Sequence, residues 1–117
     1  MYRFEMRTEE LPFIPVNNNY GPRLKVLADK RRWRGHVLSA GEPPPEPLKK
    51  AHCVFERCSS MKPETNHLIW SFKLIKEALV ETKILEGLSA IHEPIHLWTP
   101  GRPGSGYTRV IVSEVLS

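Results

Sequence analysis

The clearest hydrophobic pattern in the chain runs from Glu64 to Glu86. Within it, apolar residues recur at steps of three and four, at Leu68, Phe72, Ile75 and Leu79. This spacing places them along one side of an α-helix. Pro63 precedes the stretch and Gly87 follows it, as is typical of helix starts and ends. The pattern predicts one helix from about Asn66 to Lys83, whose apolar stripe needs a covering surface.

Alternating patterns elsewhere predict β-strands. Near the N-terminus, Tyr2, Phe4 and Met6 alternate with charged residues, which is typical of a strand with one buried face. β-branched and aromatic residues predict three further strands, at residues 51–58, 95–99 and 107–115. Residues 100–106, PGRPGSG, are rich in glycine and proline. They are expected to join the last two strands as a hairpin.

The segment between the first two strands, residues 23–40, is strongly basic. We expect a short helix that starts near Asp29 and carries Trp33 and Val37 on one face. Four cations fall within five residues, namely Lys30, Arg31, Arg32 and Arg34, and their mutual repulsion favours an anionic partner. Trp33 then has two interpretations: a stacking surface for nucleic acid, or a core residue beneath a solvated basic face.

The order of the predicted elements is strand, loop, helix, strand, helix, strand, strand. Turn-rich residues 11–22 and the proline-rich residues 41–47 are expected to be connections. This order predicts an α+β fold, with a mostly antiparallel sheet of about four strands packed against two helices. The 117 residues, 40% of them hydrophobic, are enough for a single domain with one modest core.

Charge and cysteine content indicate the kind of partner and the cellular location to expect for the protein. The net charge of +4 and the pI near 9.3 favour a polyanionic partner. Cys53 and Cys58 are five residues apart in a predicted strand, so they point to opposite faces and cannot bridge. We therefore expect reduced thiols and a cytoplasmic location. No apolar stretch reaches 18 residues, and the N-terminus lacks a signal-peptide pattern, so neither membrane nor export is expected.

Several short motifs follow one another in a defined order along nearly the whole chain. They are Pro15-Val16-Asn17-Asn18-Asn19-Tyr20, the basic segment, Lys62-Pro63-Glu64, Glu77-Ala78-Leu79 and the later ILEG stretch. In this order the chain resembles the RusA family of Holliday-junction resolvases. The resemblance implies a small homodimeric α+β protein of phage or prophage type. It also implies a role in DNA recombination and repair, in which branched DNA is bound and cut with magnesium.

The catalytic residues of that family fall where the central helix begins. The family has two Asp residues there, a following Lys and a third Asp beyond the helix, which together suit the hard Mg²⁺ ion. Alignment on Lys62-Pro63 places Glu64 and Asn66 at the first two Asp positions. Alignment on Glu77-Ala78-Leu79 places His67 and Ile69 there instead.

Neither alignment restores the acidic pair, although the second keeps Lys73 at the family's lysine position. The chain contains a single aspartate, Asp29, which is far from this helix in sequence. We therefore expect no magnesium site of the family's kind and no cofactor. The leading hypothesis is a degenerate resolvase that binds duplex or branched DNA without metal-dependent cleavage. Its expected contacts are Lys30, Arg31, Arg32, Trp33, Arg34, Lys73, Lys76 and Arg102.

Two alternative functions stay open. In the first, the resolvase fold serves as a module that binds a host or phage protein, with Ile69, Trp70 and Leu88 in the contact surface. In the second, the protein is an active junction endonuclease. Glu64 and Glu86 would then hold Mg²⁺ in a rearranged site, because carboxylates are the ligands that this ion prefers.

Overall fold

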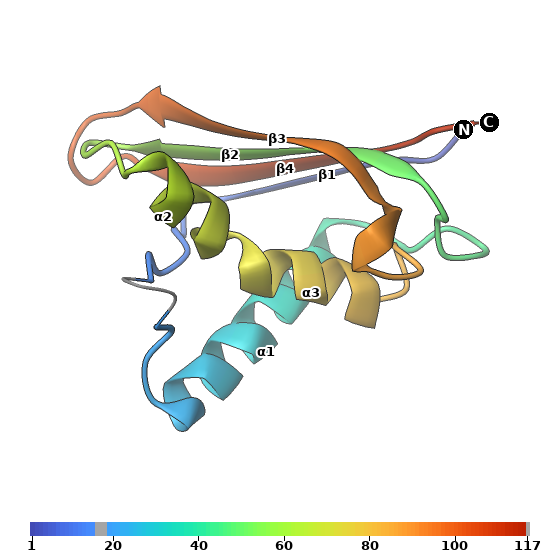
Figure 1. Ribbon diagram of the computed structural model, residues 1–117, viewed down its shortest axis with the longest axis horizontal. Helices are drawn as coiled ribbons and strands as arrows, with labels where there is room; N and C mark the ends of the chain where they lie inside the picture. The colour runs from blue at the N-terminus through green and yellow to red at the C-terminus, as the bar shows by residue number, and fades with distance from the viewer. Residues whose placement is uncertain (16–18, 117) are drawn as a thin grey trace.

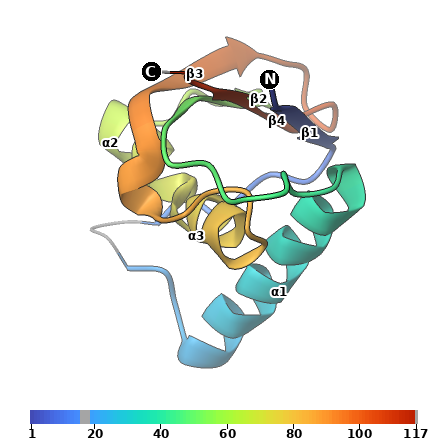
Figure 2. The ribbon, with the colours of Figure 1, turned by 90° about the vertical axis from the view of Figure 1, so that its right-hand side faces the viewer.

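One four-stranded sheet forms a layer, and all the helices lie on one side of it (Figures 1 and 2). This computed structural model describes residues 1–15 and 19–116. The elements in chain order are β1 (Arg3–Thr8), α1 (Arg23–Ala40), β2 (Ala51–Ser59), α2 (Thr65–Ser71), α3 (Lys73–Glu81), the 3₁₀ turn η1 (Leu88–Ala90), β3 (Ile91–Pro100) and β4 (Tyr107–Glu114). The predicted α+β class is confirmed.

The strand order is β1-β4-β2-β3, and two of the three neighbouring pairs are antiparallel. Only β2 and β3 run parallel. The predicted hairpin of the last two strands is therefore wrong, because β3 and β4 lie on opposite sides of β2. The physical reason is the crossover through α2 and α3, which returns the chain parallel to β2 and makes β3 an edge strand. The chain then crosses the end of β2, and β4 fills the place between β2 and β1.

The glycines of the loop between β3 and β4 are required by this crossing. A Cβ atom added to Gly101 would lie 2.7 Å from the sulfur of Cys58, and one added to Gly106 would lie 2.7 Å from the Cys58 carbonyl oxygen. Both separations are too short for real contacts. Only glycine lets the loop pass this close to the end of β2.

The core fills the space between the sheet and the helices. β1, β2 and β4 turn alternate residues toward the helices, including Phe4, Met6, Phe55, Val110 and Val112. The helices supply Trp33, Val37, Phe72, Ile75 and Leu79, all fully buried. Removal of this apolar surface from water is the main favourable contribution to folding. The expected apolar stripe of the central helix is confirmed, since Leu68, Phe72, Ile75 and Leu79 are all buried.

The predicted single helix over residues 66–83 is divided into α2 and α3, which meet at Phe72. Phe72 has φ −90° and ψ 1° and donates its amide to the Ile69 carbonyl, a 3₁₀-type bond. The hydroxyl of Ser71 donates to the Leu68 carbonyl at 2.6 Å. Such side-chain bonds back to the preceding turn compete with the regular helix ladder and bend helices. A periodicity analysis does not detect this competition.

Helix α1 is longer than predicted, with 18 residues. It begins after Pro22 without a side-chain cap, so Asp29 lies inside the helix and does not start it. Gly35 occupies an exposed interior position, where an added Cβ atom would point into open space, and the helix continues through it. Figure 2 shows α1 beside α3, with its C-terminal end near β1, in agreement with its contacts. In the described part of the chain, no helix is long and apolar enough to cross a membrane.

Polar side chains hold the sheet together on the face away from the helices. Buried Glu56 of β2 accepts hydrogen bonds from the hydroxyls of Thr99, at 2.6 Å, and Tyr107, at 3.1 Å. Arg109 Nε lies 3.3 Å from the other carboxylate oxygen of Glu56. These contacts join β2 to both neighbouring strands. Cys58 lies on the same face and Cys53 on the helix side, and both thiols are free, as expected. Both are also buried.

The crossing loop gives a test of the fold. We expect Gly106→Ala to lower the free energy of unfolding by about 1–3 kcal/mol, because its methyl group would overlap the Cys58 carbonyl. Gly35→Ala is the matched control, since it adds the same methyl group in open space within a helix. It should raise the free energy of unfolding by roughly 0.5–1 kcal/mol. Urea unfolding measures both values, and equal stability of the two variants would contradict the crossing.

Candidate nucleic-acid interface

The basic residues of α1 lie around a hollow of about 380 Å³ between α1 and the end of α3. Its lining includes Lys30, Arg31 and Arg34, with Leu27 and Glu81. The helix period places positions 27, 30, 31 and 34 on one side of α1. Lys30 lies at the border between this side and buried Trp33 and Val37, whereas Arg31 and Arg34 are exposed. The structure therefore brings three of the four predicted α1 cations together, and we call Lys30, Arg31 and Arg34 the α1 basic face.

The fourth cation, Arg32, has acidic partners. Its guanidinium lies 3.2 Å from Glu10 and 3.3 Å from Asp29. These contacts connect α1 to the segment after β1, and they place the chain's single aspartate in an ion pair.

The basic face itself is only partly neutralised. Lys30 Nζ lies 3.4 Å from Glu77 of α3. Arg31 and Arg34 are exposed, and no carboxylate within residues 1–15 and 19–116 lies within 4.0 Å of either one. Their charge is available to a solvent-side partner.

Trp33 does not take part in this surface. The side chain is 1% exposed and belongs to the hydrophobic core. The prediction of a stacking contact with nucleic acid is wrong for this residue, and the alternative interpretation as a core residue is confirmed. The reason is the helix period, which turns position 33 inward with Val37 while the neighbouring arginines point outward.

A second hollow, of about 320 Å³, lies beside α2. It brings together all three residues predicted for a protein interface with both predicted α3 lysines. The lining is Tyr20, Ile69, Trp70, Lys73, Lys76 and Leu88. The Tyr20 hydroxyl donates to the Trp70 carbonyl at 2.9 Å, and Lys73 Nζ lies 4.9 Å from the Tyr20 ring centre. We call this surface the α2 groove.

Lys76 is less available to a partner than Lys73. Its ammonium lies 5.1 Å from the ring centre of Phe55, and burial lowers the pKa of Lys76. Burial, with the Lys76 charge as a second cause, lowers the pKa of His96 to about 4, so that imidazole is neutral at pH 7. Burial also raises the pKa of Cys53 to about 11, so its thiol is protonated. Lys76 is thus partly an internal residue.

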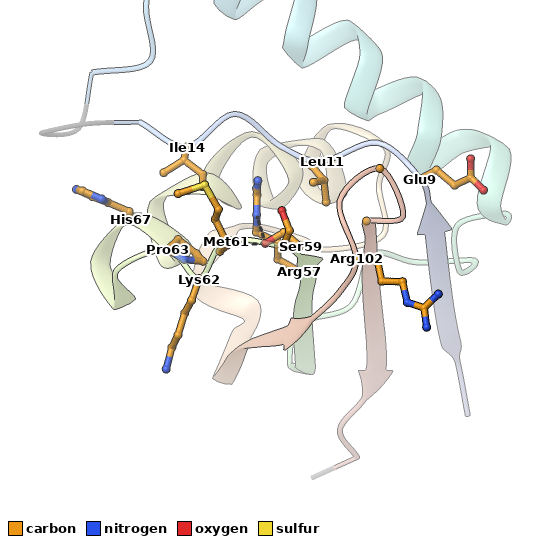
Figure 3. A pocket seen from close by; sticks show the side chains of 13 residues that line it. Glu9, Leu11, Ile14, Arg57, Ser59, Met61, Lys62, Pro63, His67 and Arg102 are labelled. Atoms are coloured by element: carbon orange, nitrogen blue, oxygen red, sulfur yellow. Dashed lines mark hydrogen bonds between the residues drawn. The ribbon is translucent and has the colours of Figure 1, made fainter.

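A cavity of about 530 Å³ lies at the C-terminal end of β2 (Figure 3). Its walls come from the segment after β1, the connection from β2 to α2, and the loop between β3 and β4. Three cations, Arg57, Lys62 and Arg102, line it with His67, and the only carboxylate in the lining is that of Glu9. Among the predicted contacts, Arg102 lies here, away from the α1 basic face. We call this cavity the strand-end pocket.

Arg57 is an important residue that the sequence analysis did not single out. It is 8% exposed, and its Nη1 donates to the Pro12 carbonyl at 2.8 Å. Burial lowers the pKa of Arg57. A signal was present in the sequence, because Cys53, Phe55 and Arg57 alternate along one strand and must share its face. An arginine in line with a core phenylalanine is a buried charge that needs an explanation.

The two glutamates of the rearranged magnesium site are not brought together. Glu64 directly precedes α2, and its side chain is 82% exposed. Glu86 follows α3, where its amide donates to the Leu48 carbonyl. The two helices therefore lie between them. In the residues that the structure describes, no group of three His, Cys, Asp or Glu side chains is arranged to hold a metal ion.

The comparisons with known proteins do not assign the chain to a family. No protein-family model matches the chain, and no curated protein matches it significantly. The resemblance to the RusA family thus rests on the sequence motifs alone and stays a prediction. Within its first motif, Val16, Asn17 and Asn18 lie outside the described residues.

Proposed function

We propose that this protein binds DNA, duplex or branched, through the α1 basic face. The observation that carries the proposal is the pair Arg31 and Arg34, two exposed arginines on one hollow with no described carboxylate within 4.0 Å. Like charges held this close repel one another. A phosphate backbone relieves the repulsion and releases its own counterions, which favours binding at low salt.

Lys73 extends this surface along α3. Lys73 begins α3, and Glu81, which lines the hollow of the α1 basic face, ends it. The eight residue steps between them span about 12 Å at 1.5 Å per residue. This length corresponds to three or four base pairs of a duplex at about 3.4 Å each. We propose that one stretch of duplex contacts Lys73 and the α1 basic face together.

Binding without metal-dependent cleavage is the second part of the proposal. It is supported by the position of the carboxylates. Asp29 is held by Arg32 in α1, and Glu64 and Glu86 lie at opposite ends of the α2–α3 pair. A magnesium site for phosphodiester hydrolysis needs carboxylates that converge on one ion. On this account the protein is a degenerate RusA-like resolvase of phage type.

A cytoplasmic location is part of the same proposal, because the two cysteines are free and buried and reduced thiols persist in the cytosol. The homodimer implied by the family resemblance also stays a prediction.

A second candidate function, capture of a protein partner, is favoured by the α2 groove. Ile69, Trp70 and Leu88, the three residues predicted for a protein interface, all line one hollow. Leu88 is 53% exposed. Aromatic and aliphatic residues gathered in a hollow are typical of binding hot spots.

The DNA-binding proposal is tested by removing the two arginines. The double variant Arg31→Ala/Arg34→Ala should weaken binding to a labelled duplex and reduce the slope of log K against log salt concentration by about two. Its fold should persist, because neither side chain is buried. Fluorescence anisotropy from 50 to 200 mM salt measures both quantities.

Arg3→Ala is the matched control, because it removes an exposed arginine of β1 that is paired with Glu5. This variant should keep the wild-type affinity. Wild-type binding that does not change with salt, or a double variant that binds as tightly as Arg3→Ala, would contradict the proposal.

The protein-capture candidate is tested by placing a charge in the α2 groove. Leu88→Glu should abolish retention of a specific protein from a cell lysate and leave the urea midpoint unchanged, because Leu88 is outside the core. Leu24→Glu on α1, where the side chain is 81% exposed, is the matched control and should retain the partner. If both variants retain the same proteins as the wild type, the groove is not a capture surface.

A further inference from the structure

The strand-end pocket contains a buried cation without a counter-ion. Arg57 points from the inner face of β2 toward the segment that carries Leu11 (Figure 3). No carboxylate in the described part of the chain lies within 4.0 Å of it. Burying a charge is costly unless it is paired and hydrogen-bonded. Arg57 is only 8% exposed, so its unpaired charge indicates that something anionic completes this site.

The hydrogen bonds of Arg57 leave donors free for such a ligand. A guanidinium has five N–H donors. Nη1 donates one to the Pro12 carbonyl at 2.8 Å, and Nε makes a long contact of 3.4 Å to the Ser59 hydroxyl. The other three donors have no hydrogen-bond partner among the residues that the structure describes. Their planar arrangement matches the oxygens of an oxyanion in a bidentate contact.

The surroundings of Arg57 add further positive charge. Lys62 and Arg102 lie on either side of it at the rim, and their side chains extend outward (Figure 3). Lys62 Nζ lies 5.7 Å from the Trp98 ring centre, in a cation–π contact. The described lining of the pocket thus contains three cations and one carboxylate, that of Glu9. A cleft with one predominant sign of charge concentrates ions of the opposite sign.

We propose that the strand-end pocket binds a phosphate group, with Arg57 as its bidentate partner at the base and Lys62 and Arg102 at the rim. Three cations suit a doubly charged phosphate monoester better than a single carboxylate. The volume of about 530 Å³ lies in the range of small-molecule sites and accommodates a mononucleotide or the end of a nucleic-acid strand. The proposal does not rest on the α1 basic face, which is a separate surface.

Arg57 also has a structural role, and the test must separate the two. Its bond to Pro12 fastens the segment after β1, so Arg57→Gln is expected to lower stability by itself. The double variant Lys62→Ala/Arg102→Ala removes only exposed rim charge and should fold normally. Arg57→Lys keeps a buried positive charge but removes the planar pair of donors.

The experiment is thermal unfolding of the full chain with inorganic phosphate or with sodium chloride at the same ionic strength. A ligand that binds the folded state raises its unfolding temperature with concentration. We expect phosphate, and not chloride, to raise the unfolding temperature of the wild type. The apparent affinity should fall about tenfold in Lys62→Ala/Arg102→Ala and in Arg57→Lys, and should be unchanged in Arg31→Ala/Arg34→Ala. An equal rise with chloride, or an unchanged response in the rim variant, overturns the proposal.

Two sources of the phosphate are separated by two further ligands. A mononucleotide tests a free phosphate ester, and an oligonucleotide with or without a 5′-phosphate tests a strand end. Tighter binding of the 5′-phosphorylated strand assigns the pocket to nucleic acid, whereas tighter binding of the mononucleotide assigns it to a free nucleotide. Because the α1 variants bind phosphate normally on this account, failure here and failure of the DNA-binding proposal are distinguishable.

Discussion

The packing of Phe55 against Phe72 is the contact on which the rest of the structure depends. The two rings lie 5.3 Å apart, and both side chains are fully buried. Phe55 projects from the middle of β2, the strand that lies between β4 and β3, and Phe72 lies where α2 and α3 meet. Burial of each ring is worth about 1.5–3 kcal/mol, with about 0.5–1.5 kcal/mol more for an aromatic pair.

The same contact determines where the strand-end pocket forms. The α2–α3 pair covers the inner face of β2 at Phe55, and Arg57 lies two residues farther along the strand on that face. At Arg57 the sheet is covered by the segment after β1 and no longer by a helix. Arg57 donates to the Pro12 carbonyl of this segment, and Thr108 donates to its Glu10 carbonyl. The cationic pocket is thus a consequence of how far the helices extend over the sheet.

Local patterns were sufficient to locate the strands and the helical segments of this fold, but not the break at Phe72 or the start of α1. Period-two alternation located β1, and three- and four-residue steps located the stripe from Leu68 to Leu79. The order of the strands was not predictable in the same way, because it depends on pairing between distant residues such as Phe55 and Val110. The glycines of the loop after β3 are typical of hairpins, yet here they permit a crossing over Cys58.

The candidate site shows the same division between local and long-range information. The sequence located the α1 cations and most residues of the α2 groove, because spacing along a helix decides which of its side chains share a face, but it did not single out Tyr20. It did not show which cations are neutralised. Lys30 and Arg32 meet Glu77 and Glu10, which are distant in the chain, whereas Arg31 and Arg34 meet no carboxylate in the described part of the chain. Arg57 was missed because a charged residue within a short strand was assigned to the strand pattern alone.

Binding without cutting is the central claim of this account, and one gel experiment tests it most directly. A labelled four-way junction and a matched linear duplex are each mixed with the protein at low salt, with Mg²⁺ or with chelator. Native gels score binding, and denaturing gels score strand cleavage. The account predicts a shifted band that chelator does not remove, with every strand at full length. A shortened strand that needs Mg²⁺, or no shift of either DNA, would contradict it.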